Sequence, residues 1–182
     1  MRAVEISAVV LFFAMLAFCV PKLSLQYIPP ALVAGWLLAD LSSGLVHWAL
    51  DTYGSVRTPV LGPAFIRPFR EHHADPLGMT RHDFFEVNGA SCLGCLPILF
   101  FSFFVEGFFH AVLVFTCVGV LLTNQCHKWA HLEEPPSFVK VLQRLRIVLR
   151  ADEHRLHHTP PYNSHFCTAS GWLNRPLNML LK

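Results

Sequence analysis

Four apolar stretches dominate this chain of 182 residues and limit the folds that are open to it. A helix needs about 17 to 25 mostly apolar residues to cross the hydrocarbon core of a bilayer. The stretches that reach this length cover residues 4–20, 28–48, 89–105 and 108–124. The sequence therefore predicts an all-α integral membrane protein, a single domain over residues 1–182 in which four transmembrane helices form a bundle.

The composition agrees with a membrane protein and argues against several other classes. Hydrophobic residues make up 53% of the chain and charged residues 14%, and the mean hydropathy is +0.44. Soluble domains carry about a quarter charged residues, so disorder, a coiled coil and an ordinary cytosolic enzyme fit poorly. A net charge of +2 is too small to indicate a nucleic-acid partner.

Two further features of the sequence have alternative interpretations. The stretch 4–20 follows a single Arg2 and lacks a small-x-small cleavage site, so we expect an uncleaved span rather than a signal peptide. Cys92 and Cys95 form a CxxC motif without a second pair, which is weak evidence for zinc or redox chemistry. We expect the cysteines to pack as small apolar residues, because most of them lie inside or beside apolar runs.

Positive charge and histidine gather on one side of this predicted topology. Four spans place both termini, residues 49–91 and everything after residue 125 on the same side of the membrane. Every Lys and Arg except Lys22 falls there, so the positive-inside rule places this side in the cytosol. Every histidine except His110 also falls there or at the cytosolic ends of spans. We expect His110 to be a dispensable residue on the lumenal side or at the interface.

Four short blocks contain most of these histidines at spacings that suit shared ligation. Residues 47–51 read HWALD and residues 127–131 read HKWAH, so the two end positions of each block face the same way on a helix. Residues 71–73 read EHH and residues 154–158 read HRLHH. Adjacent histidines on a helix point about 100° apart, which suits either two neighbouring ions or one ion and a hydrogen bond. The candidate metal ligands and catalytic residues are His47, Asp51, His72, His73, His127, His131, His154, His157 and His158.

The number of imidazoles indicates a pair of ions. Zinc sites use four ligands, or three with a water molecule, and the histidines of the four blocks exceed what one such ion can bind. Imidazole combined with carboxylate and an open position suits iron that handles oxygen. We therefore expect a cytosolic helical cap that holds a dimetal site. One block alone would more often be a solvated or capping pair, so this prediction depends on all four together.

A few other polar residues are candidates for contacting substrate or orienting ligands. They are Asp40, His82, Glu86, His165, Arg67 and Arg70. Asp40 lies inside the second span, where a carboxylate is costly, so it is either functional or a polar tie between helices. His82 can pair with Glu86 and orient a ligand, whereas His165 lies either beside the site or on the surface. The two arginines either hold a substrate phosphate or are plain positive-inside charge.

Residues 137–150 alternate apolar and basic side chains at helical spacing. Phe138, Val141, Leu145 and Val148 share one face, and the basic residues lie largely off it. Such a helix lies at the membrane interface among anionic headgroups, or it is an ordinary amphipathic helix packed on the domain.

Longer stretches around the histidine blocks are similar to one known family. They are AGWLLADLSSGLVHWALDTYGS, FIRPFREHHADPLGMTRHDFFEVNG, LLTNQCHKWAH and LRADEHRLHHTPPYNSHFCTASGWLNRPL. They resemble the Kua family, the plasmanylethanolamine desaturases, and a plastid palmitate desaturase branch shares the pattern. The resemblance covers residues 34–178, and the candidate ligands named above match the histidine-rich motifs of the family.

The resemblance implies a diiron enzyme that uses O2 and two electrons, usually from cytochrome b5, to desaturate a lipid chain. In the plasmanylethanolamine branch, the 1-O-alkyl ether of a membrane phospholipid becomes a 1'-2' vinyl ether, which makes a plasmalogen. The location would be the endoplasmic reticulum in a eukaryote and the inner membrane in a bacterium. An unactivated C–H bond offers no acidic proton, so metal–oxygen chemistry suits this reaction better than general acid–base catalysis.

Other functions stay open on the sequence alone. The apolar substrate tail can be an acyl chain, which would make the protein a fatty-acyl desaturase of a membrane phospholipid. The same ligands can serve a zinc-dependent membrane hydrolase, or a metal-handling membrane protein without catalytic activity. Metal analysis and lipid composition separate these hypotheses, because only a desaturase requires iron and changes the unsaturation of a lipid.

Overall fold

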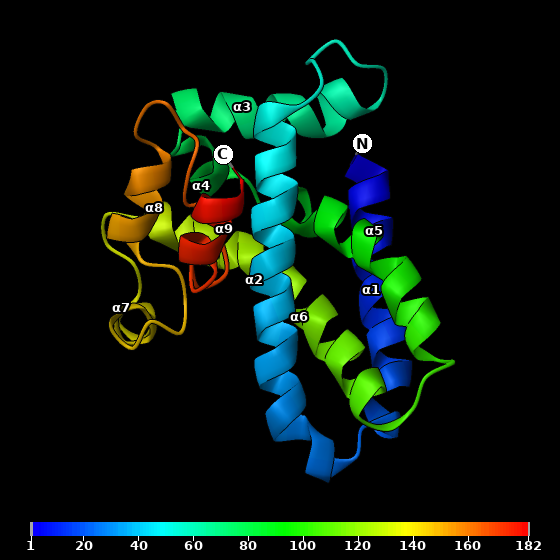
Figure 1. Ribbon diagram of the computed structural model, residues 1–182. Coiled ribbons are helices and arrows are strands. Elements are labelled where there is room, and N and C mark those ends of the chain that lie inside the picture. Colours follow the sequence, from blue (N-terminus) through cyan, green and yellow to red (C-terminus); the bar gives the residue numbers. More distant parts are fainter. Residues whose placement is uncertain (1, 182) are drawn as a thin grey trace. The chain divides into compact units, whose positions relative to one another are not determined.

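The computed structural model describes residues 2–181, which form helices joined by turns, without a strand among them (Figure 1). The α-helices are α1 (Arg2–Cys19), α2 (Ile28–Thr52), α3 (Arg67–Ala74), α4 (Gly78–Arg81), α5 (Phe84–Ser102), α6 (Gly107–His131), α7 (Ser137–Arg144), α8 (Ala151–His157) and α9 (Asn174–Leu180). Short elements between them are the 3-10 turns η1 (Val20–Lys22) and η2 (Leu25–Tyr27) and the π turn η3 (Gly62–Ile66). The all-α prediction is confirmed.

The chain divides into two compact units. The bundle unit contains the described residues up to Asp40 together with His82–Gln125. The histidine unit contains Leu41–Arg81 and the described residues from Cys126 onward. The helices α2 and α6 each contribute residues to both units.

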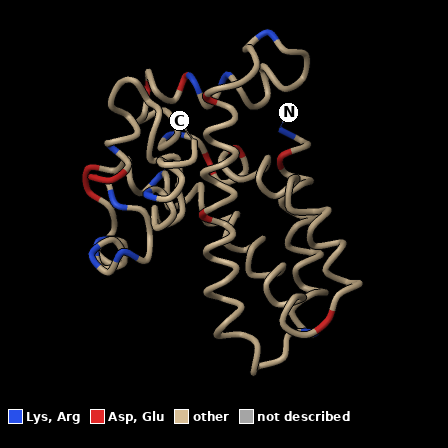
Figure 2. The backbone as a smooth tube through the Cα atoms, viewed as in Figure 1, with Lys and Arg blue, Asp and Glu red and all other residues tan. Residues whose placement is uncertain are grey.

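Among residues 2–181, four helices are long and apolar enough to cross a membrane. With their flanking turns they cover Arg2–Lys22, Leu25–Thr52, Phe84–Ser102 and Gly107–His131. The middle parts of these helices are almost free of charged residues (Figure 2). The prediction of four spans is confirmed.

The third span begins before the predicted residue 89, because Asp83 caps it. The Asp83 carboxylate accepts hydrogen bonds from the backbone N–H groups of Phe85 and Glu86. The Glu86 carboxylate accepts in turn from the backbone N–H of Asp83, which completes a capping box. The helix α5 therefore starts directly after Asp83, and it ends before the predicted residue 105.

Small residues let the helices of the bundle unit approach closely. α1 lies beside α5 (Figure 1), and a Cβ atom added at Gly89 of α5 would lie 2.7 Å from Cβ of Glu5. A Cβ atom added at Gly35 of α2 would lie 2.7 Å from Cβ of Phe115 and 2.8 Å from its backbone carbon in α6. Glycine at such positions is a common packing device between transmembrane helices, because it permits van der Waals contact of the backbones.

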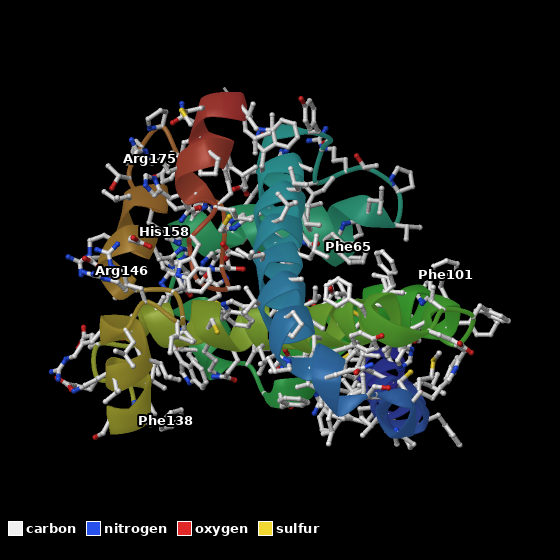
Figure 3. All side chains as sticks on the ribbon, turned by 60° about the horizontal axis from the view of Figure 1, so that its bottom comes forward. Phe65, Phe101, Phe138, Arg146, His158 and Arg175 are labelled. Carbon is white, nitrogen blue, oxygen red and sulfur yellow. The ribbon has the colours of Figure 1, made fainter. Side chains whose placement is uncertain are left out.

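The bundle unit buries part of its apolar surface and exposes the rest. Phe12 and Leu99 are completely buried in a cluster formed by α1, α5 and α6. Phe18 is 72% exposed and Phe109 is 69% exposed, and Phe101 projects outward from the end of α5 (Figure 3). Large exposed apolar patches mark contact surfaces, and on spanning helices they fit contact with lipid. All six cysteines are buried without a disulfide, as predicted.

The histidine unit packs its C-terminal segment against the end of α2. The hydroxyl of Ser43 accepts a hydrogen bond of 3.0 Å from the backbone N–H of Thr168. A Cβ atom added at Gly44 would lie 2.7 Å from Sγ of Cys167, so the two segments are in close contact. This packing fixes the segment that follows α8 against the helix that carries the first histidine block.

The predicted amphipathic helix at 137–150 is shorter in the structure. α7 ends at Arg144, and Arg146 has a positive φ of 57°, which interrupts a right-handed helix. The side-chain amide of Gln143 donates to the carbonyl of Leu149 at 3.1 Å and stabilises this reversal. The predicted end was wrong because an apolar repeat does not reveal a single left-handed residue.

Replacing Gly35 with alanine tests the close packing of α2 and α6. The new methyl group would press on the backbone of α6, so we expect a loss of about 1 to 3 kcal/mol of stability, as in other overpacked interiors. The measurement is the thermal unfolding midpoint of detergent-solubilised protein. Gly94→Ala is the matched control, because nothing lies within 4 Å of the added atom. Equal midpoints for the two variants would contradict this packing.

Candidate metal centre

Five histidines from α3, α6 and the end of α8 point their Nε2 atoms at one another, within 4.8 Å. This five-histidine group consists of His72, His127, His131, His154 and His158. Nε2 of His72 lies 3.0 Å from Nε2 of His127 and 2.9 Å from Nε2 of His131. Nε2 of His154 lies 2.9 Å from Nε2 of His131 and 3.1 Å from Nε2 of His158.

A second set, the aspartate group, consists of His47, Asp51, His73 and His157. Oδ2 of Asp51 lies 3.4 Å from Nε2 of His47 and 3.2 Å from Nε2 of His73. It also lies 3.5 Å from Nε2 of His157, and that atom is 3.2 Å from Nε2 of His73. Helical spacing explains the first pair, since His47 and Asp51 are four residues apart on α2.

The two groups are neighbours, because α3 and α8 each contribute to both. On α3, His72 belongs to the five-histidine group and the next residue, His73, to the aspartate group. On α8, His154 and His157 are divided in the same way. The ring centroids of His73 and His158 are 5.3 Å apart across the two groups, and the label of His158 marks this cluster in Figure 3. Every predicted ligand is thus brought into the cluster.

Hydrogen bonding among these side chains does not account for their arrangement. An imidazole nitrogen carries either one hydrogen or one in-plane lone pair, yet Nε2 of His72 faces both His127 and His131. Nε2 of His47 and both carboxylate oxygens of Asp51 are buried without a hydrogen-bond partner in the described part of the chain. Buried polar atoms are nearly always satisfied, so these atoms indicate a bound species.

A divalent transition-metal ion in each group would satisfy these atoms. Metal–imidazole bonds of about 2.0 to 2.1 Å place neighbouring ligand atoms about 3 Å apart at right angles and about 3.4 Å apart at tetrahedral angles. Neighbouring Nε2 atoms of the five-histidine group are 2.9 to 3.1 Å apart. The distances in the aspartate group are 3.2 to 3.5 Å. The donor atoms therefore fit two ions in both chemistry and spacing.

Two backbone carbonyl groups fix the orientation of ligands in the aspartate group. Nδ1 of His47 donates to the carbonyl of Phe166 at 3.1 Å, and Nδ1 of His157 donates to the carbonyl of Ser164 at 2.8 Å. Each ring then has its hydrogen on Nδ1 and its lone pair on Nε2, which points into the group. Sequence reasoning missed these carbonyls, because every residue has one.

Burial keeps four imidazoles outside the spanning segments uncharged. Removal from water, together with neighbouring imidazoles, lowers the pKa of His72 to about 2 and the pKa of His158 to about 4. Burial likewise lowers the pKa of His157 to about 4 and holds the pKa of His154 well below its usual value. At neutral pH these rings are in the uncharged form that binds a cation.

Arg70 positions the helix that carries His72 and His73. Its Nε donates to the carbonyl of Leu50 at 3.3 Å, and its Nη2 donates to the carbonyl of Tyr53 at 2.9 Å. These bonds tie α3 to the end of α2. The predicted contact between Arg70 and a substrate phosphate stays a prediction, and the observed bonds give this side chain a structural role as well.

A cavity of about 490 Å³ reaches the aspartate group at Asp51 and His73. Its aromatic lining residues are Trp48, Tyr53, Tyr162 and Phe166. The ring centroid of Tyr162 lies 4.8 Å from that of His73. Arg70 also lines the cavity, whereas Arg67 is not among its lining residues. The size and the mixture of aromatic and polar walls are typical of a binding site for a small molecule or a lipid tail.

Comparison with known proteins identifies the family. A family model described as a lipid desaturase domain matches residues 36–181. The chain belongs to the lipid desaturase family. The matched region of this lipid desaturase contains every member of both metal groups.

Curated relatives agree with this assignment. The plasmanylethanolamine desaturase of Myxococcus xanthus is 43% identical, and the match covers 98% of this chain and 68% of that protein. Plasmanylethanolamine desaturase 1 of Mus musculus is 45% identical over 81% of this chain and 59% of that protein. The chloroplastic fatty acid desaturase 4 of Arabidopsis thaliana is 35% identical over 82% of this chain and 48% of that protein. The chain thus spans part of each relative, and no solved structure matches it.

Three further predicted residues of this lipid desaturase lie outside both metal groups. Asp40 is completely buried in the part of α2 that belongs to the bundle unit. His82 is exposed, and its Nδ1 lies 3.2 Å from the Glu86 carboxylate in the same unit. The backbone N–H of His165 donates to the side-chain carbonyl of Asn178 at 2.8 Å. His165 therefore anchors the segment that supplies the two orienting carbonyls.

His110 has a structural place in the bundle unit and belongs to neither metal group. Its side chain is 1% exposed, and its ring nitrogens lie 2.8 Å from the carbonyl of Ser102 and 3.1 Å from the carbonyl of Cys19. It therefore joins α6 to the ends of α5 and α1. The residue lies apart from the metal ligands, as expected, but it is not a free interfacial side chain.

Metal analysis of the purified lipid desaturase tests the two groups. We expect about two metal ions per chain, because the spacing of each group fits one ion. Replacing His131 or His73 with alanine removes a ligand from one group and should lower the content toward one ion, measured by inductively coupled plasma mass spectrometry. His110→Gln is a control for the loss of a buried histidine and should keep both ions. A content of one ion per wild-type chain would contradict the assignment of one ion to each group. Two ions per chain in both His131→Ala and His73→Ala would contradict it as well.

Proposed function

We propose that this chain is a plasmanylethanolamine desaturase that converts the 1-O-alkyl ether of a membrane phospholipid into a 1'-2' vinyl ether. The reaction removes one hydrogen from each of two adjacent carbons and forms a C=C bond. It consumes O2, two electrons and two protons and releases two water molecules, so atoms and electrons balance. The single observation that carries the proposal is the pair of adjacent metal groups at the end of a cavity in a chain of this family.

The residues of the chain prepare a site for this chemistry. Iron bound in the two groups would supply the oxygen chemistry that breaks an unactivated C–H bond. Asp51 contributes the one carboxylate of the two groups, and it lines the cavity. Trp48, Tyr162 and Phe166 line the same cavity, where they hold an apolar chain and exclude water from it.

We further propose that the histidine unit faces the cytosol and that the protein lies in the endoplasmic reticulum or, in a bacterium, the inner membrane. The distribution of Lys and Arg along the four spans supports this orientation. The electrons would come from cytochrome b5 or an equivalent one-electron carrier, because the balance requires two electrons that the lipid and O2 do not provide.

Desaturation of a fatty-acyl chain is the second candidate function. The identity with a chloroplastic fatty acid desaturase of Arabidopsis favours it, but the identities with two plasmanylethanolamine desaturases are higher. A zinc-dependent hydrolase fits less well, because five imidazoles in one group exceed the four ligands that zinc prefers.

Lipid analysis of a plasmalogen-deficient cell line that expresses this chain tests the proposed reaction. We expect acid-labile vinyl ethers to appear, with a matching loss of 1-O-alkyl phospholipid, measured by mass spectrometry. His127→Ala should abolish the product, because it removes a ligand, whereas His110→Gln should retain it. New double bonds in acyl chains without vinyl ethers would support the second candidate and refute the first.

A variant of the cavity wall tests how the lipid is held. Tyr162→Ala opens the wall beside His73 without removing a ligand, so we expect unchanged metal content and a raised KM for the lipid. Water then has access to the site, and more O2 should be consumed per vinyl ether formed. Oxygen uptake and product are measured together, and Tyr27→Ala in the bundle unit is the control. If Tyr162→Ala consumed as much O2 per vinyl ether as the wild type, the ring of Tyr162 would not belong to the substrate site.

A further inference from the structure

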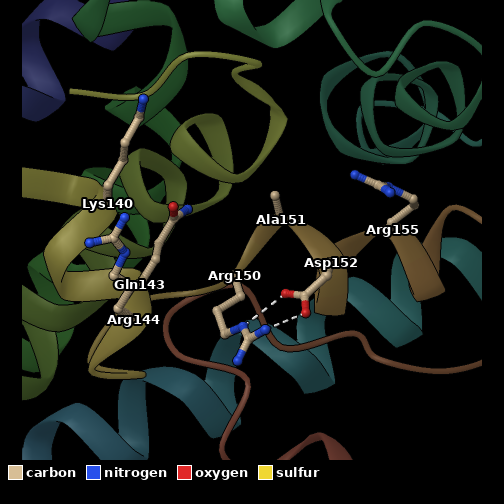
Figure 4. A pocket seen from close by; sticks show the side chains of 7 residues that line it. All are labelled: Lys140, Gln143, Arg144, Arg150, Ala151, Asp152 and Arg155. Carbon is tan, nitrogen blue, oxygen red and sulfur yellow. Dashed lines mark hydrogen bonds and ion pairs between the residues drawn. The ribbon is translucent and has the colours of Figure 1, made fainter. Parts of the chain in front are cut away.

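A second depression of the histidine unit, separate from the cavity at the aspartate group, lies between α7 and α8. This α7–α8 groove has a volume of about 510 Å³, and charged and polar residues line it together with Ala151 (Figure 4). The lining residues are Lys140, Gln143, Arg144, Arg150, Ala151, Asp152 and Arg155. It contains four cationic side chains and one carboxylate, so its field favours an anionic partner.

Two of the four cationic side chains, those of Arg144 and Arg155, form no ion pair in the described chain. Arg150 forms an ion pair with Asp152, and Lys140 pairs with Glu134. No carboxylate of residues 2–181 lies within ion-pair distance of Arg144 or Arg155. Both of these side chains are exposed, which places uncompensated positive charge on each wall of the α7–α8 groove.

The geometry of α7 argues against a flat membrane as the occupant of the groove. Phe138, Val141 and Leu145 form an exposed apolar stripe, and Phe138 and Leu145 are 58% and 63% exposed. At 100° per residue the centre of this stripe lies about 130° around the helix from Lys140 and about 90° from Arg144. Figure 3 shows Phe138 at the end of α7 that is away from α8. A membrane that contacts the stripe therefore leaves the α7–α8 groove open to water.

The helix α8 connects the groove to the metal ligands. Ala151, Asp152 and Arg155 line the groove, whereas His154 of the same helix belongs to the five-histidine group. The Cα atoms of Arg155 and His154 are neighbours about 3.8 Å apart. An electron that arrives at the groove has only the thickness of one helix to cross, about 10 Å.

We propose that the α7–α8 groove is the docking site of an acidic one-electron carrier protein that supplies electrons to the five-histidine group. The proposal rests on the proposed function, because the desaturation balance requires two electrons from outside. Each docked carrier is oxidised by one electron, and two reduced carriers serve one turnover. Weak electron-transfer complexes have small interfaces in which complementary charge provides steering and orientation.

Binding of the soluble haem domain of cytochrome b5, an acidic one-electron carrier, to the full detergent-solubilised chain tests the proposal. We expect Arg144→Glu to raise the Kd about tenfold, and rising salt to weaken binding by the wild type. Arg175→Glu on α9 carries the same charge reversal outside the groove (Figure 3) and should leave the Kd unchanged. Equal effects of Arg144→Glu and Arg175→Glu on the Kd would overturn the proposal. Lys140→Glu provides a second groove variant, and thermal midpoints exclude misfolding.

Activity measurements separate this proposal from the proposed function. The metal-loaded enzyme is reduced chemically and mixed with O2 and ether lipid, and we expect equal vinyl ether from wild type and Arg144→Glu. With the haem domain as reductant, Arg144→Glu should show a raised KM for the carrier only. Absence of product from the chemically reduced wild type would refute the proposed function while leaving the binding result intact. If Arg144→Glu lost binding to phosphatidylserine vesicles but kept the wild-type KM for the carrier, the groove would be a binding site for lipid headgroups. This result would overturn the docking proposal.

Discussion

The burial of uncharged imidazoles beside one carboxylate is the constraint on which the histidine unit depends. Four helices, α2, α3, α6 and α8, point ligand atoms inward, and Asp51 and Nε2 of His47 have no hydrogen-bond partner in the described chain. Such unpaired buried atoms are costly, and a cation bound in each group would remove this cost. Burial also lowers the pKa of His72 and His157, and this leaves both rings in the uncharged form that can bind a cation.

Helix geometry divides the candidate ligands between the two groups. His72 and His73 are adjacent on α3 and point in different directions, so one short helix serves both groups. The same holds for α8, where His154 and His157 are divided. A movement of either helix changes both groups together. The bonds from Arg70 to the end of α2 restrain α3 and thereby both halves of the centre.

The spans and the clustering of the candidate ligands could be predicted, because both follow from local periodicity. The length of apolar runs indicates the spans, and the spacing of His47 and Asp51 indicates one helix face. The spacing of His72 and His73 left open whether they serve two sites or one, and their division between two groups depends on how α3 packs against α2. The carbonyls that orient the ligands and the left-handed turn at Arg146 also lack a sequence signal. Each depends on tertiary packing rather than on a residue type.

The two ligand groups are chemically unequal, and their surroundings differ in a corresponding way. The aspartate group opens to a cavity with aromatic walls, whereas the five-histidine group shares α8 with a groove of positive charge. A lipid tail needs an apolar path that excludes water, and a carrier protein needs a wet, charged surface. One opening cannot satisfy both requirements. Because α8 supplies candidate ligands to both groups and also forms a wall of the groove, the proposed entry of electrons lies on one face of this helix, apart from the proposed lipid site beside Asp51 and His73.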